Sequence, residues 1–168
     1  IVVVAWLLIE GFPALSPSGE AILRVRADAT GLPRGLLKSE LEFAVTPGTF
    51  VLLYPQWIPG THAPSGPIGN LAEIAMRAPG GQTLSWRRDP LDPYRLIVEI
   101  PENLERLIVD LTYIANAASV NSEGVDCHAS SSAGVIAWNT CLLYPAGPAA
   151  RDIGVDLTLA LPPRWQCA

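Results

Sequence analysis

The sequence predicts an all-β protein, an antiparallel β-sandwich with few or no helices. Apolar and polar residues alternate with a period of two in five separate segments, the pattern of a strand with one buried and one solvated face. Short strands recur about every ten residues between turns rich in proline and glycine, which is typical of sandwiches and barrels. No window of about a dozen residues shows the 3.6-residue period of a helix.

The five alternating segments are expected to be the longest strands. In the first, Leu23, Val25 and Ala27 alternate with Arg24, Arg26 and Asp28. The same pattern predicts strands at residues 37–45, 94–100, 107–113 and 153–161, and shorter ones at 50–54, 71–76, 83–87 and 134–138. Because one face of each long strand is polar, the sheets should be antiparallel with one solvated side.

Turn sequences separate these strands. Residues 46–49, Thr-Pro-Gly-Thr, and residues 78–81, Ala-Pro-Gly-Gly, combine a proline that presets φ with a glycine that accepts positive φ. We expect each to close a tight hairpin, and Pro101-Glu102-Asn103 to separate two further strands.

The chain is long enough for one domain with a sizeable core and too short to expect two. We divide it into an apolar N-terminal segment, residues 1–18, and a single β-sandwich domain, residues 19–168. The run IVVVAWLLI at residues 1–9 is far shorter than the ~20 residues that cross a bilayer. It is either the remnant of a signal peptide or a first strand. A bacterial periplasmic or secreted location is favoured over the cytoplasm, and the chain is expected to be a fragment.

Composition excludes two classes of protein. A hydrophobic fraction of 49% with only 16% charged residues is not that of a disordered chain. The net charge of −5 and the scattered basic residues disfavour nucleic-acid binding, which needs a basic face.

Cys127, Cys141 and Cys167 form no C-x-x-C motif, so neither a zinc knuckle nor a redox motif is predicted. A Cys127–Cys141 disulfide and buried free thiols both remain open.

No catalytic, cofactor-binding or metal-binding residue is predicted in this chain. His62 and His128 are its only histidines, and neither begins an H-E-x-x-H motif. Asp126-Cys127-His128 places an acid, a thiol and an imidazole in succession, but neighbours on a strand point to opposite faces. A polar turn is therefore favoured over a stand-alone hydrolase that uses Cys127.

Aromatic and apolar residues suggest two kinds of contact surface. Trp57, Trp86 and Trp138 are either a sugar-stacking platform or core residues, and the core is favoured. Leu142, Leu143 and Tyr144 are candidates for an exposed apolar patch that packs against another domain.

Residues 53–70, LYPQWIPGTHAPSGPIGN, contain seven prolines and glycines among eighteen residues. This stretch is expected to be a stiff connection between strands, because proline fixes φ and lowers the flexibility of the loop. We predict a loop that faces either another domain or a ligand, formed by Trp57, Pro59, Gly60, Thr61 and His62.

Four segments together resemble the N-terminal domain of the glycyl aminopeptidase family of zinc metallopeptidases, from about Gly19 to Ala168. They are LLYPQWIPGTHAPSGPIGNLAEI, LSWRRDPLDPYRLIVEIP, LLYPAGP and LALPPRW. The residues that match the family pattern are Pro55, Trp57, Pro59, Gly60, Trp86 to Pro90, Tyr94, Leu161, Pro162 and Trp165.

The resemblance implies a β-sandwich that precedes a thermolysin-like catalytic domain. That domain carries H-E-x-x-H, binds one zinc and releases N-terminal glycine or alanine. None of these catalytic residues has a counterpart here. The chain is therefore expected to be non-catalytic and to position or flank a zinc catalytic domain of the same polypeptide, with a peptide as the substrate of the parent enzyme. The alternative is a stand-alone β-sandwich module that binds carbohydrate or peptide.

Overall fold

The structure is a computed structural model that describes residues 2–6, 23–58, 61–117 and 126–167. It confirms the all-β prediction: the described residues form three sheets, and their helical turns are four 3₁₀ segments of three residues each. These turns are η1 (Leu32–Arg34), η2 (Ile68–Asn70), η3 (Trp138–Thr140) and η4 (Ala150–Asp152).

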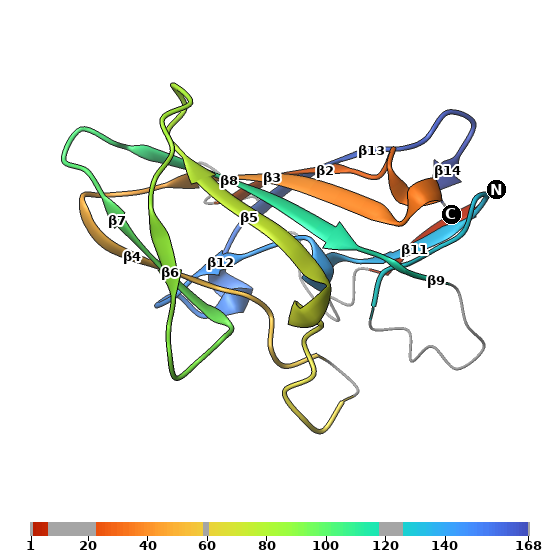
Figure 1. Cartoon of the computed structure of the whole chain (residues 1–168), viewed down its shortest axis with the longest axis horizontal. Helices are drawn as coiled ribbons and strands as arrows, with labels where there is room; N and C mark the ends of the chain where they lie inside the picture. The colour runs from red at the N-terminus through yellow and green to blue at the C-terminus, as the bar shows by residue number, and fades with distance from the viewer. Residues whose placement is uncertain (1, 7–22, 59–60, 118–125, 168) are drawn as a thin grey trace.

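The first sheet has the strand order β13-β2-β3-β8-β5. Its strands are β13 (Val155–Ala160), β2 (Leu23–Asp28), β3 (Leu36–Ala44), β8 (Arg106–Ile114) and β5 (Leu71–Arg77). The second sheet has the order β12-β4-β7-β6, with β12 (Tyr144–Pro145), β4 (Gly48–Leu53), β7 (Arg95–Ile100) and β6 (Trp86–Arg88). Figure 1 shows the second sheet crossing beneath one end of the first.

A smaller third sheet has the order β14-β1-β11-β10-β9 and lies near both chain ends (Figure 1). Its strands are β14 (Gln166–Cys167), β1 (Val2–Trp6), β11 (Gly134–Ala137), β10 (His128–Ala129) and β9 (Asn116–Ala117). Strand β1 runs parallel to β11 and β14. The boundary proposed at residue 18 lies outside the described residues and stays a prediction.

One core joins the first two sheets. Alternate residues of β3 and β8 point inward, and the ring of Phe43 on β3 meets that of Phe50 on β4 edge to face, with centroids 6.0 Å apart. The largest fully buried side chains are Tyr54, Tyr113, Phe43, Leu23, Leu32, Leu37, Leu41, Leu52, Met76, Leu96, Leu107 and Ile136. The period-two pattern of the sequence therefore identified the core face of these strands.

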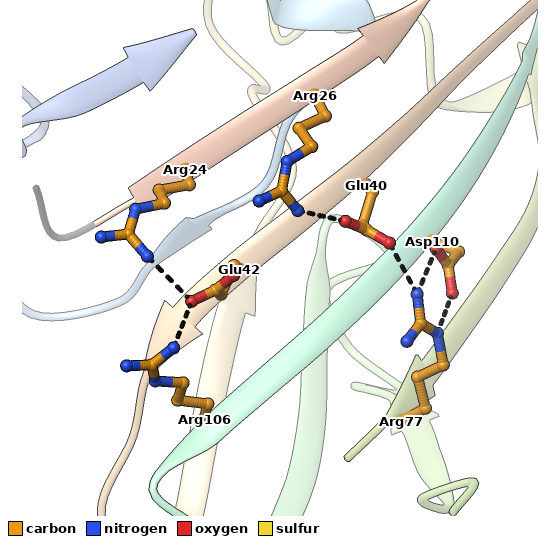
Figure 2. Close-up of polar contacts among 7 residues, drawn as sticks. All are labelled: Arg24, Arg26, Glu40, Glu42, Arg77, Arg106 and Asp110. Atoms are coloured by element: carbon orange, nitrogen blue, oxygen red, sulfur yellow. Dashed lines mark hydrogen bonds and ion pairs between the residues drawn. The ribbon is translucent and has the colours of Figure 1, made fainter. Parts of the chain in front are cut away.

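The outer face of the first sheet carries the charged residues of the same strands. Glu40 on β3 accepts hydrogen bonds from Arg26 and Arg77, and Arg77 also binds Asp110 at 2.7 Å (Figure 2). Glu42 is held in the same way by Arg24 at 3.1 Å and Arg106 at 3.3 Å. These cross-strand pairs link four adjacent strands, and they give the sheet its solvated side.

One predicted hairpin is absent from the structure. Residues 46–49 do not close a hairpin, because β3 pairs with β2 and β8 while β4 pairs with β7 and β12. The turn at 101–103 separates two strands as predicted, and it leads from β7 in the second sheet to β8 in the first. Both turns carry the chain from one sheet to the other, so strands adjacent in sequence pack across the core instead of pairing.

The last long strand is also less buried than its alternation predicts. None of the six residues of β13 is buried, and Val155 is half-exposed. The reason is that β13 lies at the edge of the sheet, where among the described strands it pairs with β2 alone, in parallel.

The predicted apolar patch at 142–144 is wrong, because Leu143 is fully buried and its two neighbours are half-buried.

Cys127 and Cys141 are both buried and form no disulfide, so of the two alternatives the structure contains the free thiols. Burial, together with the charge of Asp126, raises the pKa of the Cys127 thiol to about 12. Burial also raises the pKa of the Cys141 thiol to about 12. Cys167 is exposed.

Candidate functional site

The proline-rich loop between β4 and β5, residues 54–70, is the candidate site, and we call it the Trp57 loop. Its first residue fixes it to the core. Tyr54 is buried, its hydroxyl donates to the Thr140 carbonyl at 3.2 Å, and its N–H donates to the Tyr94 carbonyl at 2.8 Å. The rings of Tyr54 and Tyr94 are stacked with centroids 6.5 Å apart. The loop therefore starts from a rigid base.

A cross-brace holds the two arms of the loop together. The Gly66 N–H donates to the Gln56 carbonyl at 2.9 Å, and the Gly66 carbonyl accepts the Tyr94 hydroxyl at 2.9 Å. Trp57 and Pro64 form an isolated antiparallel bridge beyond this point. A Cβ on Gly66 would lie 1.9 Å from the Pro55 carbonyl oxygen, so the close approach of the two arms requires glycine.

Trp57, in the bridge between the two arms, has an exposed fraction of 65%. Its neighbour Ile58 is buried and holds this part of the loop against the protein. The Thr61 hydroxyl donates to the Ile58 carbonyl at 2.7 Å and accepts the Ser65 hydroxyl at 2.9 Å. His62 is exposed. Pro59 and Gly60, also predicted to belong to this loop, lie outside the described residues.

A polar network fixes the end of the loop at η2. The Asn70 amide donates to the Ile114 carbonyl at 2.8 Å and to Asn116 Oδ1 at 2.9 Å. The Asn116 amide donates to Asp126 Oδ2 at 3.0 Å, and the Tyr113 hydroxyl donates to Asp126 Oδ1 at 2.7 Å. Burial and the Asp126 carboxylate raise the pKa of Tyr113. The sequence did not reveal this network, because its members are far apart in the chain.

The acid–thiol–imidazole sequence does not form a catalytic pair. Cys127 is completely buried, and its raised pKa keeps the thiol protonated at neutral pH. His128 lies on β10, and both of its ring nitrogens are buried without a hydrogen-bond partner among the described residues. Asp126 is engaged by Tyr113 and Asn116 instead. The predicted polar turn is also wrong, because Cys127 belongs to the core and His128 begins strand β10.

The three tryptophans do not act as one platform. Trp86 is half-buried, packs against the core and has the Arg88 guanidinium 6.0 Å from its ring centroid. Trp138 is half-buried against the same core. Only Trp57 of these three is largely exposed, so the core interpretation fits two of them and the contact-surface interpretation fits the third.

The described residues contain neither a metal-binding cluster nor a membrane-spanning helix. No group of three or more histidine, cysteine or acidic side chains is placed to hold a metal ion in the described part of the chain. The family resemblance places its zinc in a separate catalytic domain and not among these residues. None of the described helical segments is long and apolar enough to span a membrane.

The described residues thus form an all-β domain with a braced loop that exposes Trp57. Residues 24–168 match the model of the peptidase M61 N-terminal domain. The chain belongs to this family. No curated protein matches the sequence.

One solved structure has the same fold. An aminopeptidase N family protein from Idiomarina loihiensis superposes with a TM-score of 0.69 at 18% sequence identity, over 84% of this chain. The chain spans 22% of the length of that protein. An M1 zinc metallopeptidase from Deinococcus radiodurans, a mutant bound to a Tyr-Ser-Ala substrate, matches with a TM-score of 0.30 at 14% identity. That match covers 60% of this chain and 21% of the other.

Proposed function

We propose that this domain is the non-catalytic N-terminal part of a glycyl-aminopeptidase-like zinc metallopeptidase. In this proposal it positions and flanks a zinc catalytic domain of the same polypeptide, which cleaves peptides. The family match over residues 24–168 supports the assignment to a peptidase. A periplasmic or secreted location is part of the proposal, on the strength of the apolar run at residues 1–9.

The observation that carries the proposal is the rigid presentation of Trp57. The loop is fixed at its base by Tyr54, in its middle by Gly66 and at its end by Asn70. Nevertheless the large apolar side chain of Trp57 is 65% exposed. Tryptophan is among the residues that contribute most to binding at protein interfaces. A preorganised loop also loses little conformational entropy when a partner covers it.

We expect Trp57→Ala, made in the product of the complete gene, to lower kcat/KM for a glycyl peptide about tenfold, or about 1.4 kcal/mol. The reason is that loss of the contact lets the catalytic domain shift. The free energy of unfolding of the 168-residue chain should change by less than about 0.5 kcal/mol, since Trp57 is mostly exposed.

Val155→Ala is the matched control, because Val155 is half-exposed and lies on β13, outside the loop. It should leave kcat/KM unchanged. If Trp57→Ala left kcat, KM and stability all unchanged, the loop would have no role in the enzyme.

The exposed Trp57 also favours the second candidate, a module that binds carbohydrate or peptide. That function predicts a saturable change in tryptophan fluorescence when the 168-residue chain is titrated with glycans or peptides, abolished by Trp57→Ala. We expect no such change, because Trp86 and Trp138 are half-buried against the core and leave Trp57 as the one largely exposed ring of these three tryptophans.

A further inference from the structure

The turn between β6 and β7 exposes a second large apolar side chain. Leu91 is 94% exposed, the highest value for a large hydrophobic residue in the part of the chain that the structure describes. Single exposed leucines are common on protein surfaces. Leu91 differs from these in how firmly its backbone is held.

Hydrogen bonds within the turn fix Leu91 in place. Asp89 Oδ1 accepts the Leu91 N–H at 2.9 Å, and Asp92 Oδ1 accepts the Tyr94 N–H at 3.0 Å. Arg88 Nη1 donates to the Pro93 carbonyl at 2.7 Å. Pro90 and Pro93 fix φ on either side of Leu91 and Asp92. The turn is therefore ordered before any partner arrives, and little entropy opposes a contact at its tip.

The same turn is joined directly to the Trp57 loop. Tyr94, which ends the turn, donates its hydroxyl to the Gly66 carbonyl and stacks on Tyr54. In Figure 1 the yellow loop and the green turn both project from the lower side of the molecule. Two of the four exposed large hydrophobic residues among those described thus lie in the Trp57 loop or in the turn joined to it, while Ile114 and Val155 lie on strands of the first sheet.

The outer face of the first sheet has the opposite character. Its arginines and carboxylates are already paired with one another across the strands, as Figure 2 shows for Arg26, Glu40, Arg77 and Asp110. A partner covering this face would have to desolvate these ion pairs without offering new ones, which is costly. We therefore assign this face to solvent and the loop side to a partner.

We propose that Trp57 and Leu91 together form the docking surface for the domain that follows in the same polypeptide. This inference rests on the proposed function, in which that domain is catalytic. The size of the relative supports this occupant: the present chain spans only 22% of the Idiomarina protein, so most of that protein lies outside the matched region. Two exposed apolar side chains form only a small docking surface. Such a surface suits a partner in the same polypeptide, because tethering raises the effective concentration of that partner.

Thiol labelling tests the surface without relying on catalysis. Leu91→Cys is introduced on a Cys167→Ala background, and its reaction with a maleimide is followed in the 168-residue chain and in the product of the complete gene. Cys127 and Cys141 are buried and should not react with the maleimide. We expect the introduced thiol to react at least about tenfold more slowly in the complete protein, because a docked surface excludes the reagent.

Glu102→Cys is the matched control, since Glu102 is exposed on the turn between β7 and β8. Its labelling rate should be the same in both proteins. As a second measurement, Leu91→Ser should lower the unfolding temperature of the complete protein and leave that of the 168-residue chain unchanged.

Equal labelling of Leu91→Cys in the two proteins would overturn the docking surface. Protection that appears in the 168-residue chain alone and grows with its concentration would identify a second copy as the occupant, and would also overturn the proposal. The proposed function fails separately: a complete protein that protects the thiol but cleaves no peptide keeps the docking surface and loses the peptidase assignment.

Discussion

Gly66→Ala is expected to lower the free energy of unfolding by about 2–3 kcal/mol, a typical cost of forcing an extra methyl group into a packed site. The new Cβ would meet the Pro55 carbonyl oxygen at 1.9 Å and the Gln56 Cα at 3.0 Å. Both are backbone atoms of the opposite arm, so neither can move aside by a rotamer change. The arms must separate, which breaks the Gly66–Gln56 and Tyr94–Gly66 hydrogen bonds.

Urea unfolding of the 168-residue chain measures this loss. Gly69→Ala is the control, because a Cβ there meets no atom within 4 Å although the residue is in the same loop. It should change the free energy of unfolding by less than about 0.5 kcal/mol. In the complete enzyme Gly66→Ala should also lower kcat/KM, since the displaced arms carry Trp57. A Gly66→Ala chain as stable as the control would contradict the cross-braced loop.

Stability is expected to fall steeply as the pH rises above about 9, where thiols and phenols of the unfolded chain begin to ionise. Four buried groups have a raised pKa in the folded state: Cys127, Cys141, Tyr54 and Tyr113. Burial is the main cause in each. Between the ordinary thiol value of 9.0 and the folded value of about 12, the unfolded state binds fewer protons than the folded state. The free energy of unfolding therefore decreases as the pH rises across this window. Below the window the buried groups make their full contribution to stability.

Each pKa unit is worth about 1.4 kcal/mol, so each thiol accounts for a few kcal/mol of alkaline sensitivity. Urea unfolding at a series of pH values from about 7.5 to 10.5 gives the slope. Cys127→Ala should reduce it, even though the smaller side chain also lowers stability at neutral pH. Cys167→Ala, at an exposed position, should leave the slope unchanged. A free energy of unfolding that is constant across this range would show that these groups are not shielded from water.

Local pattern was enough to predict the strands and their buried faces. In β2 the alternation of Leu23, Val25 and Ala27 with charged residues matches the observed burial. The same information did not predict which strands pair. Residues 46–49 have the composition of a hairpin turn, but such a turn serves equally well to cross between two sheets. The partner of a strand depends on contacts distant in sequence, which local pattern does not contain.

The candidate site was also only partly predictable, because local pattern does not contain contacts distant in sequence. Proline and glycine in residues 53–70 indicated a stiff loop, and the structure shows how it is braced. Trp57, Trp86 and Trp138 look alike in sequence, however, and only the packing around each decides that Trp57 is the exposed one. Leu91 gave no signal, because an apolar residue between two Asp-Pro turns is as readily buried as exposed.

The pairing of β13 with β2 has a consequence for how the chain is made. Strand β2 begins at Leu23 and its edge partner β13 ends at Ala160, so the first sheet joins nearly the earliest and the latest described strands. A ribosome releases the chain from its N-terminus. During synthesis β2 must therefore wait, with one edge open to other chains, until residue 160 has emerged. Folding of this domain is accordingly expected to finish after its translation and to be slow, as is usual where distant segments must meet.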